Sequence, residues 1–207
     1  PWFDKFHEMH PTIPIGCSEY GCEALNWHTS NPRQGDYTEE YQAYYHEELI
    51  KQLFTRKYMW ATHVWNMFDF GADARAEGGE NGQNHKGLVT IDRKYKKDAF
   101  YAYKAWLNPE PMVHICSKRY CYRPEKYTIV KVYSNCKRVT LLVDGKEFAT
   151  QTGKKVYTFR IPLKEDTRVE AVTENCRDEA MFHFTPNPVT SYKLNKKIAG
   201  GGNWTAD

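Results

Sequence analysis

The pattern of the chain changes near residue 108, and this change restricts the folds open to it. Before that point, residues 14–19 and 58–67 have the character of buried strands. Residues 40–56 and 94–107 have apolar side chains at helical spacing. Strand, helix, strand, helix is the order of a parallel α/β unit. We therefore predict a βαβα arrangement over the first half of the chain.

After residue 108 only short strand-like runs follow, and such runs are typical of a β-sandwich. The tripeptide Asp144-Gly145-Lys146 predicts a tight hairpin turn between residues 140–143 and residues 147–149. In the first half, Thr38 and Glu39 provide a helix start with acidic residues in the first turn. Residues 70–86 are rich in Gly, Asp and Asn and are expected to form a loop. The strands expected in the second half are 112–116, 128–134, 138–143, 155–161 and 168–174.

Two βα units cannot close an eight-stranded barrel or form a free-standing sheet with both faces buried. We therefore expect either a sheet completed by another polypeptide or a chain that is a piece of a larger protein. A partner surface should cover Ile15, Trp60 and Val64, through self-association or through the remainder of a parent chain. The sandwich, by contrast, should fold independently.

Composition excludes several classes of function. Lys and Arg number 29 and Asp and Glu 26, so the net charge of +3 gives no reason to expect nucleic acid as a partner. No run of about 18 apolar residues exists, which argues against a membrane span. The Cys17/Cys22 and Cys116/Cys121 spacings are wider than the usual pairs of zinc ligands, so no metal site is expected. The Lys94–Lys97 cluster is expected to form the solvated face of a helix.

Four residues are candidates for chemistry. Glu19 lies at the end of the first expected strand, where a barrel keeps its active site, although a lone Glu there is often a solvated rim residue. Trp65 follows the second strand and could support a sugar ring, or could belong to the core. Asn84 and Lys86 offer an amide and a cation to hydroxyl or carboxylate groups, or could simply be solvated.

Together these motifs resemble the last quarter of the catalytic barrel of glycoside hydrolase family 2, and most closely its β-galactosidase branch. The runs after the barrel, PEPMVHICSKRY, VKVYSN and VTLLVDGKE, resemble the immunoglobulin-like domain that follows the barrel in that family. The matching barrel stretches are SEYGCEA (18–24), TEEYQAYYHE (38–47), WATHVWNMFDFGADAR (60–75), EGG (77–79) and NHKGLVTIDRKYKKDAFYAYKAWL (84–107).

The resemblance implies an α/β plus all-β fold: the βαβα end of a (β/α)8 TIM barrel over residues 1–108, an immunoglobulin-like sandwich over 109–187, and a linker or tail over 188–207. It implies that Glu19 is the catalytic nucleophile and that Trp65, Asn84 and Lys86 bind substrate. The family's acid/base Glu has no counterpart in these residues, so the isolated chain is expected to be inactive. No cofactor is expected within this chain, although Mg²⁺ or Na⁺ could bind elsewhere in a parent.

The sequence is consistent with three hypotheses of function. A retaining glycosidase acting on β-galactosides or related oligosaccharides is preferred, because whole stretches resemble that branch. A β-glucuronidase of the same family is the alternative. In β-glucuronidases the Asn-x-Lys element reads a sugar carboxylate, but β-galactosidase-like sequences carry a similar element, so the resemblance at Asn84 and Lys86 does not decide the sugar. The third is a non-catalytic structural or carbohydrate-contacting module. The expected location is the bacterial cytoplasm, which is preferred over the periplasm or secretion. Asn203-Trp204-Thr205 matches the pattern of a glycan acceptor, and we interpret this match as chance.

Overall fold

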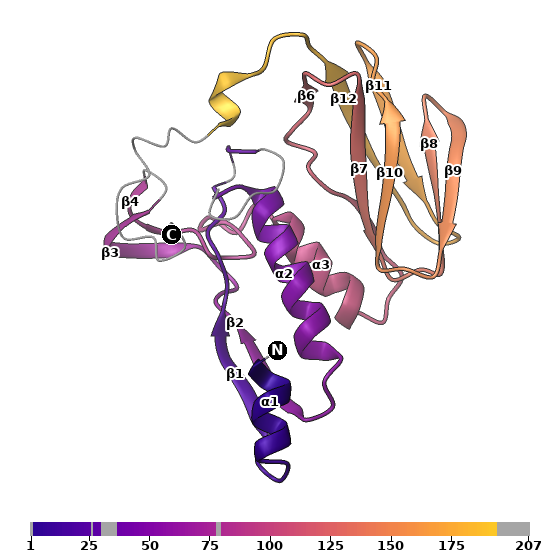
Figure 1. Ribbon diagram of the computed structural model, residues 1–207. Helices are drawn as coiled ribbons and strands as arrows, with labels where there is room; N and C mark the ends of the chain where they lie inside the picture. The colour runs from indigo at the N-terminus through magenta and orange to yellow at the C-terminus, as the bar shows by residue number, and fades with distance from the viewer. Residues whose placement is uncertain (1, 26, 30–36, 78–79, 194–207) are drawn as a thin grey trace.

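The computed structural model describes residues 2–25, 27–29, 37–77 and 80–193 (Figure 1). Its first half mixes helices with short strands, and its second half is built from strands. Within the described residues, no helix has the length and apolar character needed to cross a membrane. In chain order, the elements of the first half are α1 Trp2–Met9, β1 Ile15–Tyr20, α2 Glu39–Phe54, β2 Met59–Val64, β3 Phe70–Glu77, β4 Glu80–Asn84 and α3 Asp98–Leu107.

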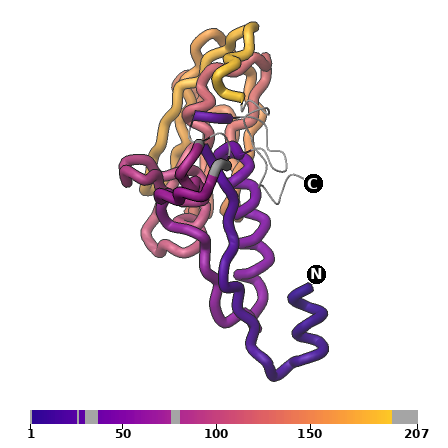
Figure 2. Tube along the Cα trace, turned by 90° about the vertical axis from the view of Figure 1, so that its left-hand side faces the viewer, coloured from indigo at the N-terminus to yellow at the C-terminus, as the bar shows by residue number. Residues whose placement is uncertain are grey.

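Strands β1 and β2 pair in parallel, with Ile15 opposite Met59 and Tyr20 opposite Val64. Helix α2 connects them, and both views show it beside β1 (Figures 1 and 2). The helix begins where the sequence indicates, because the Thr38 side chain accepts a hydrogen bond from the Tyr41 N–H at 3.2 Å. The predicted strand, helix, strand order is confirmed.

Two expectations for the first half are wrong. The predicted loop over 70–86 contains the antiparallel hairpin β3–β4, in which Phe70 lies opposite Asn84. The predicted helix over 94–107 begins only at Asp98. The residues before it are held in extended backbone, because Lys97 N–H donates to Leu88 O at 2.8 Å and Lys96 forms a bridge with Val89.

Two sheets face each other in the second half, one with the order β10-β7-β5 and one with the order β6-β12-β11-β8-β9. Apolar side chains from both sheets fill the space between them, among them Val132, Leu141, Phe159 and Val169. The bounds are β5 Val113–Ile115, β6 Tyr122–Arg123, β7 Tyr127–Ser134, β8 Arg138–Val143, β9 Lys146–Thr152, β10 Val156–Pro162, β11 Thr167–Val172 and β12 Arg177–Phe184.

The predicted hairpin joins β8 to β9, and its two turn residues have positive φ: 50° at Asp144 and 75° at Gly145. A turn with both central residues in this region is the type that matches the twist of a hairpin. The five strands expected in this half are all present, while β6, β9 beyond its first residues, and β12 were not foreseen.

The two halves are in contact through side chains. Tyr133 on β7 packs in the same cluster as Ile50 and Leu53 of α2, rather than in the core between the two sheets. Glu47 of α2 accepts hydrogen bonds from Tyr133 OH and from Lys131 Nζ, the latter at 2.7 Å. The boundary near residue 108 is therefore a change of architecture across which the two halves pack together.

The expectation that a partner surface covers the sheet formed by β1 and β2 is wrong for one of its residues. Ile15 is only 6% exposed because this chain itself covers it, so the expectation that a partner must cover it is wrong. Trp60 on β2 is 70% exposed, and a partner surface over it stays a prediction. At the end of the described chain, residues 190–192 form a short 3₁₀ helix, and Thr29 N–H donates to Tyr192 O at 2.8 Å. The rest of the expected tail, with Asn203, lies outside the described residues.

Candidate active site

The carboxyl ends of β1 and β2 meet at one place. Glu19 lies one residue before the end of β1 and is exposed. Trp65 follows β2, and its N–H donates to Tyr20 O at 2.8 Å. A Cβ on Gly21 would lie 1.8 Å from the Trp65 carbonyl oxygen, so glycine is required for the two strand ends to approach this closely. Glu19 and Trp65 therefore belong to one edge of the small sheet.

The segment from Asn84 to Leu88 is joined to the same edge by main-chain hydrogen bonds. Ala24 N–H donates to His85 O at 3.0 Å, and Asn66 N–H donates to Lys86 O at 3.2 Å. Leu88 N–H returns a bond to Asn66 O at 3.0 Å. The structure thus places all four residues singled out in the sequence on three adjoining segments.

The candidate residues differ in exposure. Trp65 is 41% exposed, and its ring meets Phe70 edge-on at a centroid distance of 5.9 Å, so Trp65 is not a core residue of this chain. Asn84 is buried, and the Lys86 side chain is 13% exposed. Neither Asn84 nor Lys86 is a solvated loop residue.

A buried carboxylate, Glu23, holds the Asn84–Lys86 element. Its Oε1 accepts from Asn84 Nδ2 at 3.2 Å and lies 3.2 Å from Lys86 Nζ. Its Oε2 accepts from the His85 N–H at 2.6 Å. No motif considered in the sequence predicts a role for Glu23. Its position four residues after Glu19, directly beyond the strand end, is the signal that could have found it.

A second buried ion pair, Lys97 with Asp69, also contacts the backbone of the Asn84–Lys86 element. Lys97 Nζ lies 2.9 Å from each of three oxygens: Asp69 Oδ1, Ala24 O and His85 O. Asp69 Oδ1 also accepts from Gly87 N–H at 2.8 Å. Burial lowers the pKa of Lys97, while the Asp69 carboxylate acts in the opposite direction. The expectation that Lys97 lies on a solvated face is wrong, since its side chain is fully buried.

Asp98, His114 and Cys116 also gather potential metal-ligand atoms, all within 4.8 Å of one another. Asp98 Oδ1 lies 2.8 Å from His114 Nε2, and Asp98 Oδ2 accepts from Ser117 N–H at 2.7 Å. Burial raises the pKa of the Cys116 thiol, which disfavours the thiolate that a metal would need. Hydrogen bonds of Asp98 to His114 and to Ser117 therefore join the start of α3 to β5 and the residues after it.

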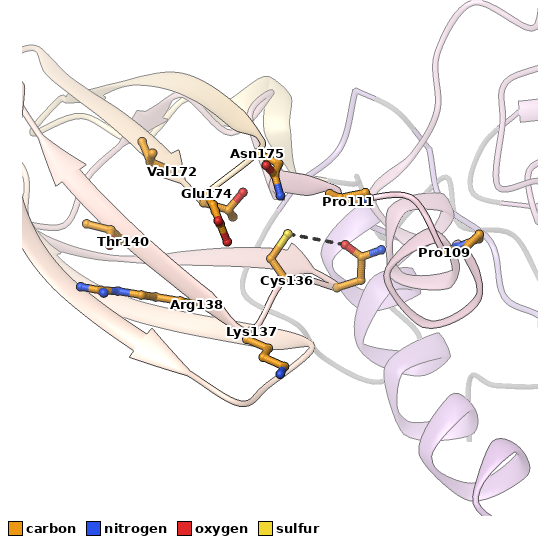
Figure 3. A pocket seen from close by; sticks show the side chains of 11 residues that line it. Pro109, Pro111, Cys136, Lys137, Arg138, Thr140, Val172, Glu174 and Asn175 are labelled. Atoms are coloured by element: carbon orange, nitrogen blue, oxygen red, sulfur yellow. Dashed lines mark hydrogen bonds between the residues drawn. The ribbon is translucent and has the colours of Figure 1, made fainter.

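A hollow of about 560 Å³ lies at the end of the sandwich nearest residues 109–111 (Figure 3). Pro111, Cys136, Arg138, Glu174 and Asn175 are among the residues that line it. Cys136 Sγ contacts Asn135 Oδ1 at 3.8 Å, the interaction dashed in Figure 3. None of the four candidate residues lines this hollow.

The arrangement at the strand ends suits the chemistry of a carbohydrate site. An exposed carboxylate can act as a nucleophile, and an exposed aromatic ring can stack on the apolar face of a sugar. A lysine ammonium and an asparagine amide beside them can bind a substrate carboxylate. Cleavage with retention needs a second carboxyl group as acid/base.

The chain is similar to several known proteins. The chain is 41% identical to a β-glucuronidase of Bacteroides fragilis over 151 residues, covering 70% of this chain and 22% of that protein. It matches the crystal structure of an FMN-binding β-glucuronidase from Faecalibacterium prausnitzii L2-6 with a TM-score of 0.91 and 47% identity, covering 94% of this chain and 31% of that chain. A Bacteroides fragilis structure named "putative beta-galactosidase" matches with a TM-score of 0.81 and 28% identity, covering 89% of this chain and 30% of that chain. No family model matches.

The relatives of this chain are thus glycoside hydrolases, and the chain spans about a fifth to a third of their length. The names of β-glucuronidases dominate among them, so the expected β-galactosidase branch is not supported. The sheet-rich architecture with few helices is shared with these β-glucuronidase chains.

Proposed function

We propose that this chain is part of a retaining glycoside hydrolase of family 2 that cleaves terminal β-glucuronides. The observation that carries the proposal is the buried Asn84–Lys86 element beside the strand ends of Glu19 and Trp65. A cation and an amide held at a sugar site suit a uronic acid, which carries a carboxylate where a galactoside carries a neutral hydroxymethyl group. The names of the most similar relatives support the same choice.

In the proposed mechanism, the Glu19 carboxylate attacks the anomeric carbon and displaces the aglycone. A covalent glycosyl-enzyme forms, and water then hydrolyses it with retention of configuration. Trp65 packs against the sugar, and Asn84 and Lys86 bind its carboxylate. The acid/base carboxyl group comes from outside the 207 residues, so the chain alone does not turn over substrate.

The architecture assigned to this parent follows the same proposal. The β1–α2–β2–α3 half supplies the last two βα units of a (β/α)8 barrel, and the sandwich is its immunoglobulin-like neighbour. Trp60 packs against the remaining barrel, or against a second copy when that barrel is absent. We propose a bacterial cytoplasmic protein that uses no cofactor within this chain, with Mg²⁺ or Na⁺ confined to other parts of the parent.

A comparison of two aryl glycosides tests the function. The intact enzyme should hydrolyse the β-glucuronide with a far higher kcat/KM than the β-galactoside. Lys86→Gln should lower kcat/KM for the glucuronide by about tenfold or more and change that for the galactoside little, because it removes a charge-assisted bond. Lys51→Gln, on the exposed side of α2, is the matched control. An enzyme that prefers the galactoside would contradict the glucuronidase assignment, and one inactive on both would contradict the enzyme class.

A further inference from the structure

We infer that Glu23 is a positioning residue that gives the site its selectivity for a substrate carboxylate, an inference that rests on the proposed function. Glu23 is 7% exposed and lies directly behind the two residues proposed to bind that carboxylate. It makes its contacts from the segment after β1, whereas Asn84 ends β4 and Lys86 lies between β4 and α3. Glu23 thereby connects β1, which carries Glu19, to the Asn84–Lys86 element proposed to bind the sugar carboxylate.

Three donors converge on this one carboxylate. They are the Asn84 amide at 3.2 Å, the His85 N–H at 2.6 Å and the Lys86 ammonium at 3.2 Å. Only a carboxylate offers two oxygens that both accept; a glutamine offers one oxygen and directs an NH₂ group at a neighbouring donor. The orientation of both Asn84 and Lys86 therefore depends on the two oxygens of the Glu23 side chain.

The backbone of the element has other supports. Lys97 Nζ binds His85 O, and Asp69 Oδ1 binds Gly87 N–H. Gln42 Nε2 donates to Gly87 O at 3.3 Å. Loss of Glu23 should therefore disturb the side chains of Asn84 and Lys86 more than the path of the chain. This division separates a role in substrate recognition from a role in folding.

The contact with Glu23 also affects how the Lys86 ammonium binds substrate. A lysine ammonium has three donors, so it can bond to Glu23 and to a substrate carboxylate together. Held by Glu23, the ammonium is already oriented when substrate arrives, which reduces the entropy lost on binding. A neutral sugar gains nothing from this arrangement. Glu23 should therefore act on KM for a uronide, and little on kcat or on a galactoside.

Steady-state kinetics of the intact enzyme test this role with Glu23→Gln, Glu23→Asp and the control Glu48→Gln, which changes an exposed carboxylate on α2. Glu23→Gln should raise KM for an aryl β-glucuronide by about tenfold or more, as expected for loss of charge-assisted bonds, with kcat changed less than about threefold. Glu23→Asp keeps both acceptors and the charge, so its KM should lie nearer wild type. Thermal melting of each variant monitors folding independently.

Several results would overturn the inference. An equal rise of KM for the glucuronide and the galactoside would show no selectivity, and an unchanged KM would show no role at all. If KM for the glucuronide were as high in Glu23→Asp as in Glu23→Gln, the carboxylate would not explain the effect. A fall in melting temperature large enough to account for the lost activity would also overturn the inference. If the wild-type enzyme does not cleave the glucuronide, the proposed function fails first and this inference fails with it; failure of the variants in an active enzyme overturns this inference alone.

Discussion

Lys97 and Asp69 form an ion pair that is almost completely removed from solvent: Nζ lies 2.9 Å from Oδ1, and the two side chains are 0% and 4% exposed. A pair buried to this degree is costly unless other partners satisfy it. Here the carbonyls of Ala24 and His85 and the N–H of Gly87 supply them. The pair therefore holds together the backbone at Ala24, His85 and Gly87.

Lys97→Met should be severely destabilising, because it leaves the Asp69 carboxylate buried without its cation. Removing one partner of such a pair costs about 3–5 kcal/mol. The free energy of unfolding of the chain in urea measures the loss. Adding Asp69→Asn to Lys97→Met should recover part of it, and a Lys97→Met variant within about 1 kcal/mol of wild type would contradict the assignment.

Glu40 should make the stability of the chain fall as pH rises. Burial raises the pKa of Glu40 to about 7, and the nearby Asp98 carboxylate acts in the same direction. The folded state therefore holds a proton that the unfolded state has lost, so the stabilisation is complete below about pH 4.5 and disappears as pH passes 7. Between pH 4.5 and pH 8, the free energy of unfolding of Glu40→Gln should therefore rise relative to that of wild type by on the order of 2–3 kcal/mol.

Urea unfolding of both proteins at several pH values measures this difference. Glu48→Gln, at an exposed site on the same helix, serves as the control and should follow wild type at every pH. A constant difference between Glu40→Gln and wild type would mean that Glu40 is ionised alike in both states.

In the intact enzyme, Glu19→Gln should lower kcat for the aryl β-glucuronide by several orders of magnitude, because the amide cannot form the glycosyl-enzyme. Binding of a non-hydrolysable uronic acid should persist, since Asn84 and Lys86 remain. Turnover within about tenfold of wild type would exclude Glu19 as nucleophile.

Residues 109–193 should fold alone, because the core between the two sheets is contributed entirely by residues of the sandwich. The isolated sandwich loses the contacts of Glu47 with Tyr133 and Lys131. Tyr133→Phe should therefore cost about 1–2 kcal/mol in the whole chain and almost nothing in the isolated sandwich. Chemical unfolding of the four proteins measures both values, and an isolated sandwich without a cooperative transition would contradict independent folding.

Trp60→Ser should weaken self-association of the 207-residue chain. The ring is 70% exposed on a two-stranded sheet, and an exposed tryptophan on an uncompleted sheet favours contact with a second copy. The association constant from sedimentation should fall by roughly tenfold or more, from the apolar area lost. A wild-type chain that is monomeric at all concentrations would contradict this prediction.

Local signals in the sequence predict the parts of the fold that depend on local chemistry. Thr38 marks the start of α2 because its hydroxyl caps the helix, and Asp144-Gly145 marks the β8–β9 turn because both residues accept positive φ. Hairpin β3–β4 escapes prediction because Gly71, Asp73 and Gly82 are residues that strands usually avoid. Its pairing depends on register, and composition does not reveal register.

For the site, the sequence gives the residues that are expected to meet substrate, but misses those that hold them. Glu23 and Lys97 look like ordinary surface residues, and Lys97 follows two other lysines within a short run. Their importance comes from partners far away in the chain, such as Asn84 for Glu23 and Ala24 for Lys97. Periodicity and short motifs describe neighbours in sequence, so they do not detect such pairs.

The position of Lys97 in the chain has a consequence for the order of events during synthesis. A ribosome makes Glu19, Trp65 and Lys86 before it makes Lys97, which directly precedes α3. Until this lysine has left the exit tunnel, the carbonyls of Ala24 and His85 lack the ammonium group that binds them both. The site therefore reaches its final arrangement only after residues that take no part in its chemistry have been translated, and a pause in translation before α3 would leave the site unfinished.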